Sequence, residues 1–290
     1  MTFIPPPFSP IDAIASFRRA AQLNREDPYR HGSILKLPAY GQAVMTGDLH
    51  GHMKNFDKLT RYAMLDRVAA RHVILHEMVH CETGERAVDH SHQLLLQAAQ
   101  YKCTYPEQVH FLQSNHELAQ FTGYPIAKNG RPVIDDYNNS VEFAYGSDIV
   151  DEALAAMNEF IATFPIAIRT ENRVWMSHSL PNRRDMEGFD FSVFDRELTP
   201  EDIREDGPVF RLVWGRNHTR EQIDEIAARL GVDIFITGHQ PQEQGFDVRF
   251  DRMIILASDH NHGTFLPFDL SRKQTVDDLI ANIRKFVAVE

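Results

Sequence analysis

The sequence predicts an α/β fold in which two mixed β-sheets stack as a sandwich and helices cover the outer faces. In the first half of the chain, apolar runs typical of strands alternate with amphipathic segments of helical period. In the last third, short apolar runs follow one another with only turns between them. The chain has 290 residues, of which 43% are apolar, enough for a sizeable core. Alternating segments favour parallel strands and closely spaced runs favour antiparallel pairs, so we expect both kinds of pairing.

The helices are predicted from apolar side chains that recur with helical spacing. The first covers residues 11–23, with Ser9 as its candidate N-terminal cap. Pro165 and Gly231 end two later helices, because Pro cannot continue a helix and Gly favours the left-handed C-terminal position. Further helices are expected at residues 55–65, 89–101, 149–164, 219–230 and 276–287.

The strands are predicted from short apolar runs bounded by turn residues. They are expected at residues 30–37, 42–45, 71–75, 109–112, 166–168, 174–176, 232–236, 246–250, 253–257 and 264–268. Residues 122–140 contain Gly, Pro and Asn and are expected to form an irregular loop, and residues 181–208 are charged and turn-rich.

Neither a repeat nor a linker divides the sequence, so we expect one domain. Its body is predicted at residues 42–270. Residues 1–41 are interpreted as an N-terminal extension, and residues 271–290 as a C-terminal helix that packs on the same domain.

Composition excludes several classes of function. The formal net charge is -11 and no basic stripe with interleaved aromatic residues is present, so we expect no direct nucleic-acid partner. Two cysteines, Cys81 and Cys103, make a disulfide framework improbable. The first residues lack the features of a signal peptide, and no apolar run reaches membrane-spanning length. We therefore expect a cytoplasmic protein without a membrane partner; the sequence leaves the oligomeric state open.

Side chains suited to metal binding follow several of the expected strands. Asp48 and His50 follow one apolar run and lie between Gly47 and Gly51, which let the backbone approach a ligand closely. Ligands in open α/β folds bind beyond the carboxyl ends of strands. Carboxylate, amide and imidazole groups without a thiolate suit two divalent ions of the Zn, Fe or Mn kind, bridged by one carboxylate. The side chains concerned are Asp48 and His50, Glu77, Asn115 and His116, His178, and His239.

Five segments in order resemble the motifs of one enzyme family. They are Gly-Asp-Leu-His-Gly at 47–51, Ser-Asn-His-Glu after the strand at 109–112, Ser-His-Ser-Leu-Pro at 177–181, Gly-His-Gln-Pro at 238–241, and Ala-Ser-Asp-His-Asn at 257–261. On these motifs, residues 42–269 resemble a calcineurin-like metallophosphoesterase, in particular its serine/threonine phosphoprotein phosphatase branch. Pro241 stands where many members outside that branch have a second His, which favours the branch.

The resemblance implies a four-layer α/β/β/α fold and a hydrolase with two divalent ions (Mn, Fe or Zn). A metal-bridging hydroxide would attack a phosphomonoester, with phosphoserine or phosphothreonine protein favoured over a small phosphorylated substrate. The implied ligands of metal 1 are Asp48, His50 and Glu77, and those of metal 2 are Glu77, Asn115, His178 and His239. His116 would be the general acid. Arg216, or Arg183 and Arg184, would hold the phosphate, and Asn115 and His260 would contact substrate.

The second motif departs from the family pattern Gly-Asp-x-x-Asp-Arg-Gly. Residues 76–82 read His-Glu-Met-Val-His-Cys-Glu instead. Glu77 keeps a bridging carboxylate with one more methylene, and His80 replaces the Asp that orients the acid. A neutral His80 can still accept the N–H of His116. Cys81 replaces an Arg that grips phosphate.

Two alternatives follow from this altered motif. Residues 76–80 also form a His-Glu-x-x-His string, which on a helix binds zinc in metalloproteases, with Glu82, Glu85 or Glu117 as a weak third ligand. The string follows an apolar run typical of a strand, which makes this alternative the less favoured one. The other alternative is a phosphatase fold with weakened catalysis that serves as a binding module.

Overall fold

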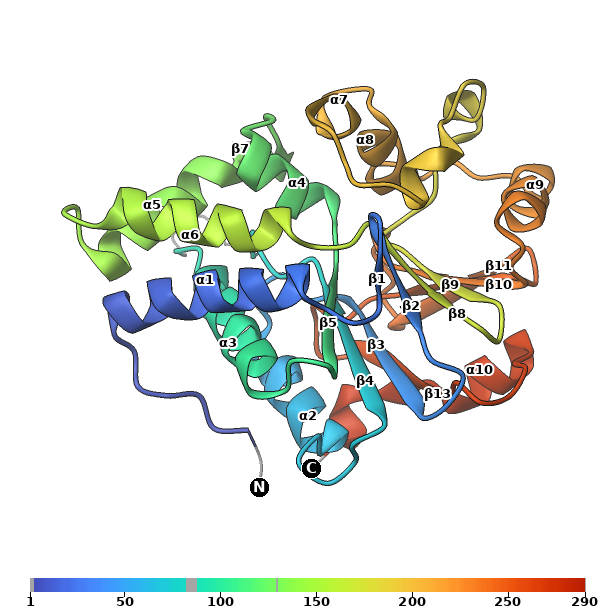
Figure 1. Ribbon diagram of the computed structural model, residues 1–290, viewed down its shortest axis with the longest axis horizontal. Coiled ribbons are helices and arrows are strands. Elements are labelled where there is room, and N and C mark those ends of the chain that lie inside the picture. Colours follow the sequence, from blue (N-terminus) through green and yellow to red (C-terminus); the bar gives the residue numbers. More distant parts are fainter. Residues whose placement is uncertain (1–2, 82–87, 129, 290) are drawn as a thin grey trace.

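The computed structural model describes residues 3–81, 88–128 and 130–289, and Figure 1 shows their arrangement. Two main sheets lie against each other, and each has helices on its outer face. Both sheets contain parallel and antiparallel pairs, so the predicted mixed α/β sandwich is confirmed.

The larger sheet gathers strands from the beginning, middle and end of the chain. The pairs β2–β8, β9–β10 and β10–β12 are parallel, and β1–β2, β8–β9 and β11–β12 are antiparallel. From one edge to the other, the order is β1 (Arg30–His31), β2 (Ile34–Leu37), β8 (Ala167–Thr170), β9 (Val174–Met176), β10 (Ile234–Thr237), β12 (Met253–Leu256) and β11 (Phe246–Arg249).

The smaller sheet has three neighbouring parallel strands whose carboxyl ends are level. Asp48 on β3 pairs with His76 on β4, and His76 pairs with Leu112 on β5. Side chains that follow these strands therefore start from one edge of the sheet. The strand order is β14 (Arg284–Lys285), β13 (Thr264–Asp269), β3 (Gln42–Asp48), β4 (Arg71–His76) and β5 (Val109–Leu112).

The helices form two outer layers (Figure 1). Against the smaller sheet lie α1 (Pro10–Arg25), α2 (Met53–Ala63), α3 (Ser91–Thr104), α5 (Val133–Tyr145) and α6 (Val150–Ala162). Against the larger sheet lie α8 (Pro208–Val213) and α9 (Arg220–Leu230), with α7 (Pro200–Ile203) and the 3-10 turns η1 (Arg183–Asp185) and η2 (Phe191–Phe194) nearby. The remaining elements are α4 (Asn115–Thr122), the hairpin β6 (Ala127–Lys128) and β7 (Arg131–Pro132), α10 (Val276–Asn282) and η3 (Phe286–Ala288).

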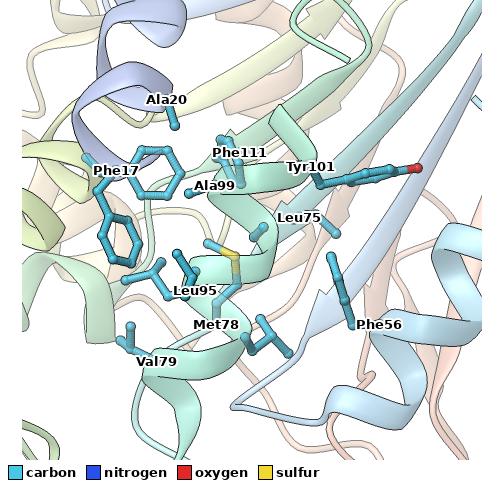
Figure 2. Packing of buried hydrophobic residues seen from close by; sticks show 14 of the residues in the cluster. Phe17, Ala20, Phe56, Leu75, Met78, Val79, Leu95, Ala99, Tyr101 and Phe111 are labelled. Carbon is cyan, nitrogen blue, oxygen red and sulfur yellow. The ribbon is translucent and has the colours of Figure 1, made fainter. Parts of the chain in front are cut away.

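The alternation of side chains along the strands separates three large apolar clusters, two outside the sheets and one between them, and a small fourth cluster lies at Ala119, Ile126 and Val133. On β3, Ala43 and Met45 face the cluster between the two sheets, whereas Val44 faces the helices outside. Figure 2 shows part of this outer cluster, in which side chains of α1 and α3 meet those of β4 and β5. There the ring of Phe111 stacks on Phe164 with centroids 4.6 Å apart.

Three predicted segments differ from the structure. Residues 122–140 are not an irregular loop, because the helix α5 begins at Val133. Its buried side chains Tyr137 and Val141 are four residues apart, which is a helical spacing. The prediction gave more weight to the neighbouring Gly, Pro and Asn residues and was therefore wrong. The predicted helix 276–287 ends at Asn282, because the following residues pair with the edge of β13. The predicted strand 30–37 is a hairpin that turns at Gly32, where φ is +58°.

Residues 3–41 contribute to the helical layer outside the smaller sheet and to the larger sheet. Helix α1 packs on α3 and α6, and β2 pairs with β8 in the larger sheet. The predicted domain limits at residues 41 and 270 stay predictions. Among residues 3–81, 88–128 and 130–289, no helix has the length and apolar character needed to cross a membrane.

A cluster of titratable side chains is buried between α1, α3, β4 and β5. His72 Nδ1 lies 3.0 Å from His110 Nε2, and His110 Nδ1 lies 3.1 Å from Asp27 Oδ2. The ammonium group of Lys102 donates to the same oxygen at 2.9 Å. Every member therefore has a hydrogen-bond partner, as buried polar groups require.

Candidate metal centre

The polar side chains predicted from the strand ends meet in one cleft. Asp48 ends β3, Glu77 follows β4, and Asn115 begins α4 after β5. His178 and His239 follow β9 and β10 of the larger sheet. The two sheets join here, because the amide of Ser258 donates to the carbonyl oxygen of Asp48 at 3.0 Å. The cleft has a volume of about 820 Å³, and its walls include Asp48, His50, Glu77, Asn115, His116, Arg216, His239 and His260.

Three donor atoms converge on one nitrogen of His178. Its Nε2 lies 2.7 Å from Asn115 Oδ1, 3.0 Å from His239 Nδ1 and 3.3 Å from Glu77 Oε1. A single imidazole N–H can serve only one of these neighbours. The lone pairs of these atoms point at a common place and repel one another, and a bound cation would stabilise this arrangement. The predicted ligand set of metal 2 is therefore brought together.

His50 is oriented by the backbone. Its Nδ1 lies 3.0 Å from the carbonyl oxygen of Val79, so Nδ1 donates and Nε2 keeps its lone pair. That Nε2 lies 3.5 Å from Glu77 Oε2. His50, Glu77, His80 and His239 all have a positive φ, between +41° and +68°. Such left-handed backbone costs free energy in non-glycine residues and gathers at functional sites.

The carboxylate of Asp48 contacts the backbone of His239. Both of its carboxylate oxygens accept the amide of His239, at 3.0 and 2.9 Å. Its Oδ1 also lies 3.2 Å from Nε2 of His76 and 3.8 Å from Nδ1 of His178. The structure thus groups Asp48 with His76 and His178, with ligand atoms within 4.8 Å of one another. Sequence reasoning considered His76 only in the metalloprotease alternative and not as a ligand beside Asp48, although it ends the apolar run of β4 directly before Glu77.

Two further groups of donors overlap at Glu77, and the second of them shares His178 with the first group. They are His50, Glu77 and His116, and Glu77, His178 and His239. Which ion each predicted ligand would hold stays a prediction.

The electrostatics of the cleft fit a bound cation. Burial, and then the negative charge of Asp48, raise the pKa of Glu77 well above its usual range. A positive ion is therefore needed for both carboxylates to be ionised together. Burial lowers the pKa of His50 to about 4 and that of His239 to about 3, so both rings are neutral at neutral pH, as metal binding requires. Among the described residues, Glu77 Oε1 and His178 Nδ1 are buried without a hydrogen bond.

A chain of hydrogen bonds orients His116. Its Nδ1 lies 3.0 Å from His80 Nδ1, and His80 Nε2 lies 2.8 Å from Gln120 Oε1. The amide nitrogen of Gln120 donates to Asn138 Oδ1 at 2.9 Å, so Oε1 faces His80 as an acceptor. His80 Nε2 therefore carries the proton, and His80 Nδ1 accepts from Nδ1–H of His116. A neutral His80 can thus occupy the place of an orienting carboxylate. No local pattern in the sequence indicates the role of Gln120.

The residues proposed to hold phosphate separate in space. Arg216 lines the cleft, and its Nε donates to His239 Nε2 at 2.9 Å. Arg183 and Arg184 line a different hollow. Lys128, which sequence reasoning missed, also lines the cleft. Cys81 lies in the cleft wall, and burial together with Asp89 raises the pKa of its thiol to about 12, so it stays protonated.

The metalloprotease alternative is wrong for this chain. His76 ends a strand, and Glu77 and His80 have left-handed backbone, so the string is not helical. The two His side chains have different neighbours, namely Asp48 for His76 and His116 for His80. Of the weak third ligands, Glu117 instead accepts the amide of Met78, and Glu82 and Glu85 lie outside the described residues.

Comparisons with known proteins identify the family and the fold. Residues 43–243 match the family model described as calcineurin-like phosphoesterase. A solved serine/threonine phosphatase of Saccharomyces cerevisiae with similarity to human phosphatase PP5 has a TM-score of 0.70 at 16% identity, and the match covers 98% of this chain and 91% of that one. A cold-active protein-tyrosine phosphatase of a psychrophilic Shewanella has a TM-score of 0.57 at 15% identity, with 82% and 78% covered. These structures are similar to this chain in fold. No curated protein matches the sequence.

Proposed function

Since the chain belongs to the calcineurin-like phosphoesterase family and is thus a hydrolase, we propose that it acts on phosphomonoesters and favours phosphoserine and phosphothreonine residues of proteins. The preference for these residues is supported by the motif resemblance and by the fold similarity to a yeast serine/threonine phosphatase. A small phosphorylated substrate is the alternative.

The observation that carries the proposal is the convergence on His178 Nε2. Asn115, Glu77 and His239 each place a donor atom within 3.3 Å of it, and all three residues line the cleft. We propose two divalent ions, chosen from Mn, Fe and Zn, because the donors are oxygen and imidazole nitrogen without a thiolate. When bound, such ions supply Lewis acidity to phosphoryl oxygens and lower the pKa of the attacking water.

The protein side chains orient the substrate and deliver a proton. Arg216 and Lys128 line the cleft and supply positive charge for the phosphoryl oxygens. His116 is the general acid that protonates the leaving oxygen. Because its Nδ1–H is held by His80, the proton that it delivers is carried on Nε2, so the acid is the imidazolium form of His116. Burial lowers the pKa of His116, and the negative charge of the bound phosphoester offsets this effect in the substrate complex. Gln120 holds His80 in the tautomer that accepts this hydrogen bond.

The test is a set of phosphatase assays combined with metal analysis. The purified protein is assayed with added Mn²⁺ on p-nitrophenyl phosphate, phosphocasein and small phosphorylated metabolites. We expect His116→Asn to retain metal and lower kcat on phosphocasein by about 10²–10⁴-fold. The matched control is His31→Asn, because His31 is exposed on β1 and should leave kcat unchanged.

Each outcome addresses a different part of the proposal. Metal binding without turnover on any phosphoester would contradict the proposed activity and favour the binding module. Turnover of small substrates without release of phosphate from phosphocasein would contradict only the preference for phosphoprotein.

A further inference from the structure

We propose that His76 is a metal ligand, which together with Asp48 and Nδ1 of His178 holds a divalent ion of the zinc, iron or cobalt kind. Because a neutral imidazole has one lone pair, His178 then binds this ion in place of metal 2. The family motif has Gly at this position, so the resemblance does not include His76 among the ligands. The inference rests on the proposed function to the extent that the cleft must bind metal. It changes the interpretation of the altered second motif from a damaged site to a different ligand set.

The position of His76 is fixed by the smaller sheet. It is the last residue of β4, and the register of the parallel strands places it beside Asp48 at the end of β3. Its Nε2 lies 3.2 Å from Asp48 Oδ1, and its ring lies edge-on to the ring of His178 with centroids 5.3 Å apart. A carboxylate oxygen and two imidazoles are thus within one coordination shell of each other. This is an established combination for zinc and related ions.

Neither ring nitrogen of the fully buried His76 makes a well-formed hydrogen bond among the described residues, and Nε2 has an ion-pair contact with Asp48 Oδ1 at 3.2 Å. Leaving a buried polar group unsatisfied is costly, so such groups call for a physical explanation. His72 gives the comparison, because it lies on the same strand, is also buried, and has His110 as its partner. A metal ion beside Asp48 would satisfy one ring nitrogen of His76.

Gly238 provides the space for this arrangement. A Cβ at this position would lie 2.1 Å from Asp48 Oδ1 and 2.7 Å from His76 Nε2. The backbone of Gly238 is not in the left-handed region, so its conformation does not require glycine. Glycine is therefore needed here because any side chain would overlap Asp48 Oδ1 and His76 Nε2. Two imidazoles in the set favour borderline ions such as zinc over magnesium or calcium.

The test measures metal binding rather than turnover. The variants are His76→Gln, which keeps a polar side chain, His76→Cys, which offers a thiolate, and the control His72→Gln. Each is checked for folding by circular dichroism, loaded with Co²⁺ or Zn²⁺, and examined by elemental analysis and visible absorption. We expect His76→Gln to weaken metal affinity by at least about 10–100-fold and the control to retain it. Cobalt-loaded His76→Cys should gain a thiolate-to-cobalt charge-transfer band that the wild type lacks.

Wild-type affinity and cobalt spectrum in His76→Gln, or no charge-transfer band in His76→Cys, would overturn the assignment. If neither variant folds, anomalous scattering from zinc-loaded wild-type crystals decides. The assignment requires a zinc peak about 2.0–2.1 Å from a ring nitrogen of His76, and it fails if every peak lies beyond ligand distance. If the wild type binds no metal at all, the proposed function fails as well, whereas metal binding unaffected by His76 rejects this inference alone.

Discussion

The substitution Gly238→Ala tests whether the position of Asp48 requires a residue without a side chain at 238. The added Cβ would lie 2.1 Å from Asp48 Oδ1, whereas ordinary contact begins at 3.4 Å. The carboxylate therefore has to retreat by about 1.3 Å, or the chain around Gly238 has to move by a similar amount. Misplacing a catalytic group by about 1 Å can cost about 10²-fold in rate. We expect kcat/KM for p-nitrophenyl phosphate to fall by that factor, or about 2.7 kcal/mol of transition-state stabilisation.

The matched control is Gly188→Ala, which has the opposite properties. Gly188 has a φ of +77° but no atom within 4 Å of an added Cβ. Alanine there costs about 1–2 kcal/mol of stability through backbone strain and leaves the cleft unchanged. The assays are kcat/KM, metal content and thermal unfolding of both variants. Wild-type kcat/KM and metal content in Gly238→Ala would refute the argument that this glycine makes room for Asp48.

Three more predictions concern the hydrogen-bond chain, the buried histidines and the core. Gln120→Leu removes the acceptor of His80 Nε2–H, so we expect kcat on alkyl phosphates to fall about tenfold. The kcat on aryl phosphates should not change, because their leaving groups need no acid. Gln120→Glu restores an acceptor and should restore the rate on alkyl phosphates. Burial lowers the pKa of His72 to about 3 in the folded state. Between this value and about 6.5, only the unfolded state binds the proton, so the free energy of unfolding falls as pH falls. Urea unfolding of the metal-free protein should show that His72→Gln removes about 1 kcal/mol of the loss between about pH 6.5 and 5.5. Phe111→Ala should cost about 3–5 kcal/mol in the same assay, because its ring is fully buried against Phe164; a cost below 1 kcal/mol would contradict the assigned packing.

The strands and most helices follow from local patterns in the sequence. The run Val109–Leu112 is a strand as predicted, and the helices at α1 and α9 begin at the caps that Ser9 and Thr219 provide. Such signals are short-range, so one sequence suffices to see them. Where local signals conflict, the prediction was wrong: around α5, the Gly, Pro and Asn residues hid an apolar pattern that only packing on α3 and α6 makes decisive.

The sequence by itself determined which residue types follow the strand ends, and therefore that the chain can gather carboxylate, amide and imidazole groups in one cleft. The tertiary structure alone decided which of them are neighbours. It placed His76 with Asp48, linked His116 to Gln120 through His80, and separated Arg216 from Arg183. These relations depend on strand register, on left-handed turns at residues such as Glu77 and on the space left by Gly238. They join residues far apart in the chain, and no local pattern encodes such distances.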